Sequence, residues 1–145
     1  MKKILSDTNA YSRFLSGDQK VLNVFKEARI VYMSVFVIGE LIAGFRGGRK
    51  EEENREILRK FLAKRSVKIL NATRNTADIF GKIKHDLKIA GTPLPINDIW
   101  IAAHAIETKS VLITYDSHFE EIAGLRLWEH LRNNEMTTSK GAIKP

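Results

Sequence analysis

The chain has 145 residues, of which 43% are hydrophobic and 28% charged, a balance typical of one globular domain and not of a disordered chain. No stretch approaches 18 apolar residues and the first residues lack a long apolar region, so we expect neither a membrane-spanning helix nor a secretory signal. The absence of cysteine excludes disulfides and thiolate chemistry and fits a cytoplasmic location, while the net charge of +7 suits a polyanionic partner.

Short apolar strands alternate along the chain with longer amphipathic helices. In chain order, the predicted elements are a strand at 3–6, a helix at 18–28, a strand at 29–33, a helix capped by Ser34 and reaching Phe45, a helix at 50–65, a strand at 67–70, a helix at 73–90, a helix capped by Asn97, a strand at 111–114, a short helix at 117–122 and a strand at 125–127. This order predicts an α/β fold with a mostly parallel five-stranded sheet and helices on both faces.

Two kinds of hydrophobic pattern support these assignments. Apolar residues within 18–28 recur every three or four positions, as on one face of a helix. Residues 111–114 form a continuous apolar run, as expected of a strand covered on both faces. We predict one domain over residues 1–132, followed by a mobile tail at residues 133–145.

Four acidic residues are candidates for a site at the carboxyl ends of the strands, where such a sheet binds ligands. Asp7 directly follows the first strand, and Asp116 follows the fourth by one residue. Asp98 lies in the first turn of its helix. Glu40 is flanked by apolar residues on its own helix, so we expect its carboxylate to be buried beside a partner. These four side chains are expected to share one cleft.

Carboxylates gathered in this way repel one another unless protons or a cation neutralise them. Oxygen ligands without His or Cys suit Mg²⁺ or Mn²⁺. Such a metal would activate a water for attack on a phosphodiester, and a remaining carboxylate would accept the proton. The basic excess would attract the polyanionic substrate, with Arg46, Arg49 and Lys50 as candidate phosphate contacts.

Each acid also has a purely structural interpretation. Asp7 and Asp116 could each cap the helix that follows, and Asp98 could complement a helix dipole. The four histidines lack metal-ligand spacing and are interpreted as surface or core residues. His118 could reach the rim of the cleft, but we assign it no catalytic role.

Four motifs in this order resemble those of PIN-domain ribonucleases, and more narrowly those of VapC-type toxins. The motifs are residues 5–9 (LSDTN), 34–41 (SVFVIGEL), 94–105 (LPINDIWIAAHA) and 112–119 (LITYDSHF). The resemblance extends over about residues 3–130. It implies a PIN-like three-layer fold for the domain at residues 1–132.

The resemblance implies a metal-dependent endoribonuclease that is the toxin of a toxin–antitoxin pair. The residues that match the family's catalytic quartet are Asp7, Glu40, Asp98 and Asp116. Asp7 and Asp98 would bind Mg²⁺ (or Mn²⁺) directly, and the other two would bind it directly or through water.

The resemblance also implies supporting residues and partners. Asn9 and Thr114 match polar positions beside the quartet. The implied partners are an RNA substrate of unspecified class, a second copy of the chain in a homodimer, and an antitoxin that occludes the acidic cleft.

Two other functions stay open at this point. One is a PIN-domain nuclease that processes RNA outside toxin–antitoxin biology. The other is a non-catalytic module that binds RNA or a partner and keeps the quartet as a relic of the fold. A receiver-like or phosphatase domain is disfavoured, because no lysine follows the strand at 111–114.

Overall fold

The computed structural model describes residues 2–130, so the tail predicted at residues 133–145 lies outside the described residues. The elements are β1 (Lys3–Ser6), α1 (Thr8–Leu15), α2 (Gln19–Glu27), β2 (Ile30–Ser34), α3 (Val35–Phe45), α4 (Glu51–Leu62), β3 (Val67–Leu70), α5 (Arg74–Ala90), α6 (Ile96–Thr108), β4 (Val111–Ile113), the 3₁₀ helix η1 (Ser117–Glu121) and β5 (Arg126–Leu127). Within residues 2–130, no helix has the length and apolar character needed to cross a membrane.

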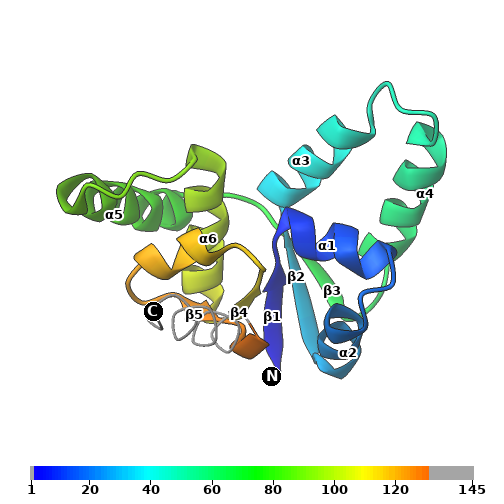
Figure 1. Cartoon of the computed structure of the whole chain (residues 1–145), viewed down its shortest axis with the longest axis horizontal. Helices are drawn as coiled ribbons and strands as arrows, with labels where there is room; N and C mark the ends of the chain where they lie inside the picture. The colour runs from blue at the N-terminus through cyan, green and yellow to red at the C-terminus, as the bar shows by residue number, and fades with distance from the viewer. Residues whose placement is uncertain (1, 131–145) are drawn as a thin grey trace, which may run out of the picture.

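The five strands form one sheet in the order β3-β2-β1-β4-β5, and every pairing is parallel. The chain builds outward from β1 to β3 and then crosses back to place β4 on the other side of β1. With right-handed crossovers, α1 to α4 cover one face of the sheet, and α5 and α6 cover the other (Figure 1). The predicted three-layer α/β fold is confirmed.

The core lies along the two central strands and the helices packed on them. Ile4 and Leu5 of β1 and Leu112 and Ile113 of β4 are fully buried. On one face, rings from α1, α2 and α4 pack together: Tyr11, Phe14, Phe25 and Phe61. This packing gives α1 a fixed position beside the end of β1.

Two of the helix caps predicted from the sequence are present in the structure, and a third is not. The Ser34 hydroxyl accepts a hydrogen bond from the Phe36 N–H at 3.1 Å, and Gly91 ends α5 with a left-handed φ of 72°. Asn97 was predicted as an N-cap, which is wrong: α6 begins at Ile96, after Pro95. Because the extended backbone of Pro95 occupies the cap position, Asn97 lies inside the first turn, where its amide donates to the Phe36 carbonyl at 3.4 Å.

Helix α6 contacts the ends of β2 and β3 and the first turn of α3. The buried His104 of α6 places Nδ1 2.8 Å from the Ser34 hydroxyl and Nε2 3.3 Å from the Asn71 carbonyl. Burial lowers the pKa of His104, so this is a neutral core histidine. Beside it the rings of Phe36, Trp100 and Phe80 stack in a row, with centroids 5.0 and 4.0 Å apart.

The Ser34→Ala variant is expected to lose about 1–3 kcal/mol of unfolding free energy, because it removes the α3 cap and leaves a buried imidazole nitrogen without its partner. Urea denaturation measures the loss. The matched control is Ser66→Ala, since Ser66 is exposed. Equal stability of the two variants would contradict this role of Ser34.

Candidate acidic active site

The candidate site lies where the strand order reverses, at the carboxyl ends of β1 and β4. Ser6 of β1 is paired with Ile113 of β4, and the N–H of Asp7 donates to the Ile113 carbonyl at 3.2 Å. Thr114 and Asp116 follow β4 on the same edge. In open parallel sheets this reversal leaves a crevice in which ligands bind.

Asp7 is both a helix cap and a buried charge. Its side chain is only 5% exposed, and Oδ1 accepts a hydrogen bond of 2.7 Å from the N–H of Ala10 in α1. Burial raises the pKa of Asp7 from 3.8 to about 6; hydrogen bonds from Thr114 and Ala10 oppose the rise, and the charges of Asp98 and Asp116 add to it. Asp7 is therefore the N-cap of α1, as the structural interpretation predicted. The hydrogen bond of the cap does not offset the cost of burying the ionised carboxylate, because the pKa still rises.

Asp98 is brought to the same place by α6. It is half-buried in the first turn of that helix. Burial raises its pKa, as do the nearby charges of Asp116 and Glu40, whereas His118 lowers it. The charges of Asp98 and Asp116 act on Asp7, and those of Asp116 and Glu40 act on Asp98, so the four predicted acids are electrostatic neighbours through Asp98.

Asp116 is held by its neighbours in the turn after β4. Its N–H donates to the Thr114 hydroxyl at 2.9 Å. Its Oδ1 lies 2.9 Å from the backbone N–H of His118 and 2.8 Å from the ring Nδ1 of the same residue. Thr114 is fully buried and contacts both Asp7 and Asp116, so one hydroxyl links two of the acids.

Glu40 differs from expectation, because it is exposed and not buried. The buried residues of α3 are Val37 and Leu41, so the covered stripe of this helix is narrower than its apolar sequence suggests. The carboxylate Oε1 accepts a 2.6 Å hydrogen bond from the Thr8 hydroxyl at the start of α1. Glu40 thus borders the site from the solvent side.

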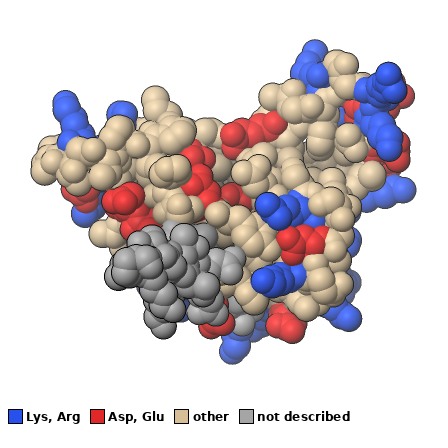
Figure 2. All heavy atoms as spheres, in the orientation of Figure 1, with Lys and Arg blue, Asp and Glu red and all other residues tan. Residues whose placement is uncertain are grey.

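The charges of the molecule are unevenly distributed over the face shown in Figure 2. Acidic side chains gather at the base of a notch between the α3–α4 side and the α5–α6 side, while basic side chains gather over the α3–α4 connection. Arg46, Arg49 and Lys50 are exposed in that connection. Arg46 lies six residues beyond Glu40, roughly 9 Å along the helix axis. The structure therefore sets these basic residues apart from the acidic cluster.

Within residues 2–130, no group of three or more His, Cys, Asp or Glu side chains is arranged to hold a metal ion by itself. The four acids influence one another's charge without converging on one point. The sequence also gave no role to His118, which lies against Asp116 and acts on Asp98. The sequence feature that could have indicated this contact is the position of His118 two residues after Asp116, which caps η1.

Comparisons with known proteins now assign the family. Residues 4–125 match the PIN domain. Ribonuclease VapC1 of Haemophilus influenzae strain R2866 is 31% identical over 112 residues, which cover 77% of this chain and 81% of the relative. The chain belongs to the PIN-domain family, in its VapC group. Ribonuclease VapC2 of Rickettsia felis is 27% identical over 107 residues, which cover 73% and 78% of the two chains.

Solved structures of related proteins share the fold of this PIN domain. DNA-bound VapBC from Salmonella typhimurium superposes with a TM-score of 0.76 at 26% identity, covering 88% of this chain and 98% of the other. VapBC-1 from nontypeable Haemophilus influenzae gives a TM-score of 0.75 at 26% identity, covering 87% and 96%. The resemblance to VapC-type PIN domains inferred from the four motifs is confirmed.

The raised pKa of Asp7 makes the stability of the metal-free protein depend on pH. Because the folded state binds this proton more tightly than the unfolded state, its contribution is fully present below about pH 3.8 and is lost as the pH rises through about 6. The ionised carboxylate then costs about 3 kcal/mol at neutral pH. In EDTA, Asp7→Asn should therefore be more stable than the wild type near pH 7, and this gain should shrink towards pH 4.

Urea unfolding between about pH 4 and pH 7.5 measures this difference. Asparagine keeps an acceptor for the Ala10 N–H, so the cap survives the substitution. The control is Glu27→Gln, which neutralises an exposed carboxylate at the end of α2. A stability difference for Asp7→Asn that stays constant over this pH range would contradict the prediction.

Proposed function

We propose that this PIN domain is a metal-dependent endoribonuclease and the toxin of a VapBC-type toxin–antitoxin pair, acting in the cytoplasm. The observation that carries the proposal is the acidic site at the reversal of the strand order, formed by Asp7, Glu40, Asp98 and Asp116. The relatives are named as VapC ribonucleases, which supports RNA as the substrate in this proposal.

The residues present fit a divalent cation. Desolvation and neighbouring carboxylates disfavour the ionised form of both Asp7 and Asp98, and a nearby positive ion would relieve this. We assign Asp7 and Asp98 as direct ligands of Mg²⁺ or Mn²⁺, with Glu40 and Asp116 binding directly or through water. Mg²⁺ retains several waters, which suits acids that do not converge on a single point. When bound, the ion supplies charge neutralisation at the phosphate and a lower pKa for the attacking water.

The chain's own residues orient the acids and handle the proton. Thr114 donates to Asp7 and accepts from the N–H of Asp116, which sets these two acids relative to each other. The Thr8 hydroxyl orients Glu40. A carboxylate not engaged by the cation accepts the proton of the attacking water.

RNA reaches the acids along the notch between the two sides of the molecule (Figure 2). We propose that Arg46, Arg49 and Lys50 bind phosphates of the strand further from the cleaved bond, since they are exposed on the α3–α4 connection. We assign Asn9, which lies in the first turn of α1, as a polar residue that supports Asp7.

The proposed protein partners are a second copy of the chain and an antitoxin. Structures of VapBC complexes from Salmonella typhimurium and Haemophilus influenzae support the antitoxin, since related chains are found there in complexes. An RNA-processing nuclease outside toxin–antitoxin biology is the alternative. Growth arrest on expression, relieved by co-expression of the neighbouring gene, distinguishes the toxin from that alternative.

The Asp98→Asn variant should abolish cleavage while keeping the fold, because it removes one proposed metal ligand and replaces it with an amide of the same size. We expect wild-type protein with Mg²⁺ or Mn²⁺ to give discrete products from a small-RNA pool, and at least a hundredfold lower rate with the variant or with EDTA. Gel analysis of the pool measures the rate.

Glu27→Gln serves as the control, because it also removes one carboxylate but lies away from the site on α2. Equal cleavage by the wild type and Asp98→Asn would exclude the proposed chemistry. Metal-independent RNA binding without cleavage in either protein would support the non-catalytic module.

Metal binding can be tested without RNA. A ligand that binds only the folded state at a hundred times its dissociation constant adds about 2.7 kcal/mol to the unfolding free energy. We expect Mg²⁺ to raise the melting temperature of the wild type, and this rise to be lost in Asp7→Asn and Asp98→Asn. Differential scanning fluorimetry with and without EDTA measures it, and an equal rise in all three proteins would place the metal elsewhere.

A further inference from the structure

A polar cleft of about 500 Å³ continues from the acidic site along α1. It is lined by Asn9, Ser12, Arg13, Ser16, Tyr115 and Asp116. Three lining residues of α1 and its C-cap Ser16 are spaced as one face of a helix, while Ala10 and Tyr11 on the opposite face are buried. Because Asp116 belongs to both the cleft and the acidic site, whatever lies in the cleft lies next to the reacting phosphate.

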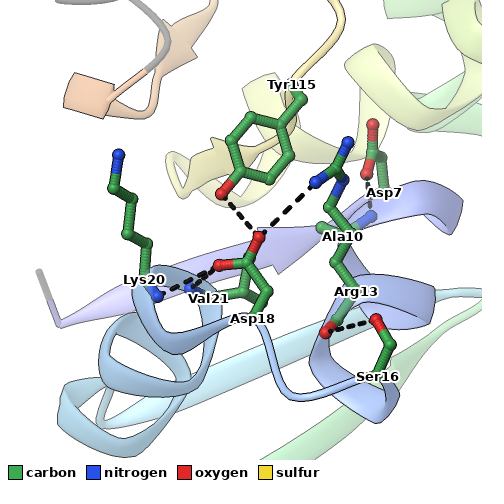
Figure 3. A network of polar contacts seen from close by, with 8 residues as sticks. All are labelled: Asp7, Ala10, Arg13, Ser16, Asp18, Lys20, Val21 and Tyr115. Atoms are coloured by element: carbon green, nitrogen blue, oxygen red, sulfur yellow. Dashed lines mark hydrogen bonds and ion pairs between the residues drawn. The ribbon is translucent and has the colours of Figure 1, made fainter.

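Arg13 is oriented in this cleft by two contacts, and its side chain is 55% exposed (Figure 3). Its guanidinium carbon lies 4.4 Å from the centre of the Tyr115 ring, and Nη1 lies 3.6 Å from Oδ2 of Asp18. The Tyr115 hydroxyl donates to the same Asp18 oxygen at 2.9 Å. A planar guanidinium held over a ring has lost part of its rotamer freedom before any ligand binds.

Asp18 is anchored independently of Arg13. Its Oδ1 caps α2 by accepting the N–H of Lys20 at 3.0 Å and of Val21 at 3.2 Å. Desolvation raises the pKa of Asp18, but these hydrogen bonds, that of Tyr115 and the charge of Arg13 together lower it below its usual value. The same hydrogen bonds hold the carboxylate in place. Arg13 therefore gains an orientation from Asp18, and it retains further N–H donors, since a guanidinium has about five.

Structural stability is a weak reason for this arrangement, because an exposed ion pair contributes about 1 kcal/mol or less. Substrate binding is a stronger one. The acids of the site repel the phosphates of a nucleic acid, so a strand crossing them needs a fixed cation beside them. A guanidinium is suited to this, because its paired N–H groups match two phosphate oxygens.

The serines of the cleft complement this cation. The Ser12 hydroxyl donates to the Thr8 carbonyl at 3.3 Å, and the Ser16 hydroxyl donates to the Arg13 carbonyl at 3.1 Å. With their hydrogens directed to the helix backbone, both oxygens remain as acceptors. A ribose 2′-hydroxyl can donate to such an oxygen.

We propose that this cleft binds the ribonucleotide next to the cleaved bond, with Arg13 holding its phosphate. The inference rests on the proposed ribonuclease function and adds a substrate subsite to it. Tyr115 and Asp18 are positioning residues, which act through Arg13.

The test uses the full chain without antitoxin and a single-stranded RNA that the wild type cleaves. Arg13→Gln should raise KM about tenfold and leave kcat within about twofold, because the lost charge-assisted hydrogen bonds bind the strand and not the reacting atoms. Affinity is measured separately by fluorescence anisotropy in the Asp98→Asn background. There, Arg13→Gln should make the slope of log K against log salt shallower by about 0.7, the value for one phosphate contact on a single strand.

Lys20→Gln is the matched control, since Lys20 is an exposed cation beside Asp18 but does not line the cleft (Figure 3). It should change KM and the salt slope by less than half as much as Arg13→Gln does. Arg13→Lys keeps the charge and loses the planar pair of donors, so its KM should lie between those of the wild type and Arg13→Gln. Circular dichroism checks the fold of each variant.

The outcomes distinguish failure of the proposed subsite from failure of the proposed ribonuclease function. If the wild type cleaves RNA and Arg13→Gln matches it in KM and salt slope, the subsite is wrong and the proposed nuclease stands. If the wild type neither cleaves nor binds RNA, both inferences fail.

Discussion

The parallel pairing of β1 with β4 is the constraint on which the site depends. Since β1 lies between β2 and β4, the chain leaves the sheet in opposite directions on its two sides, and a crevice remains at the strand ends. The hydrogen bond from the Asp7 N–H to the Ile113 carbonyl continues this pairing one residue past β1. Helix α6 packs on β4 and brings Asp98 to the same crevice. The order and pairing of the strands therefore determine where the acidic side chains lie.

The same topology exposes the Asp7 carboxylate to effects that oppose one another. The carboxylate caps α1 and is held by Thr114, which favours its charge, yet burial and two neighbouring acids disfavour that charge. Such conflicts between local and global requirements concentrate at functional sites, because a site must be ready for a ligand that the folded chain lacks. Membership of the PIN-domain family is consistent with this, since the conflict lies within the matched residues.

The sequence was sufficient for the features that depend on local pattern. The strands, their parallel direction and the positions of Asp7 and Asp116 after strand ends follow from periodicity and from the rules of βα connections. Exposure of Glu40 was not predictable in the same way, because it depends on which side of α3 the rest of the protein covers. The bond between Tyr115 and Asp18 joins residues 97 positions apart, so no local pattern indicates it.

The stacked rings between α3 and α6 have a consequence for the geometry of the acids. Glu40 lies on α3 and Asp98 on α6, and Phe36 and Trp100 of the same two helices lie face to face with centroids 5.0 Å apart. The stacked rings therefore contribute to the separation of the two helices that carry these carboxylates. We expect a substitution that changes a ring, such as Trp100→Leu, to alter the spacing of Glu40 and Asp98 without replacing either of them. Hydrophobic packing away from the acids can in this way influence the geometry of the candidate site.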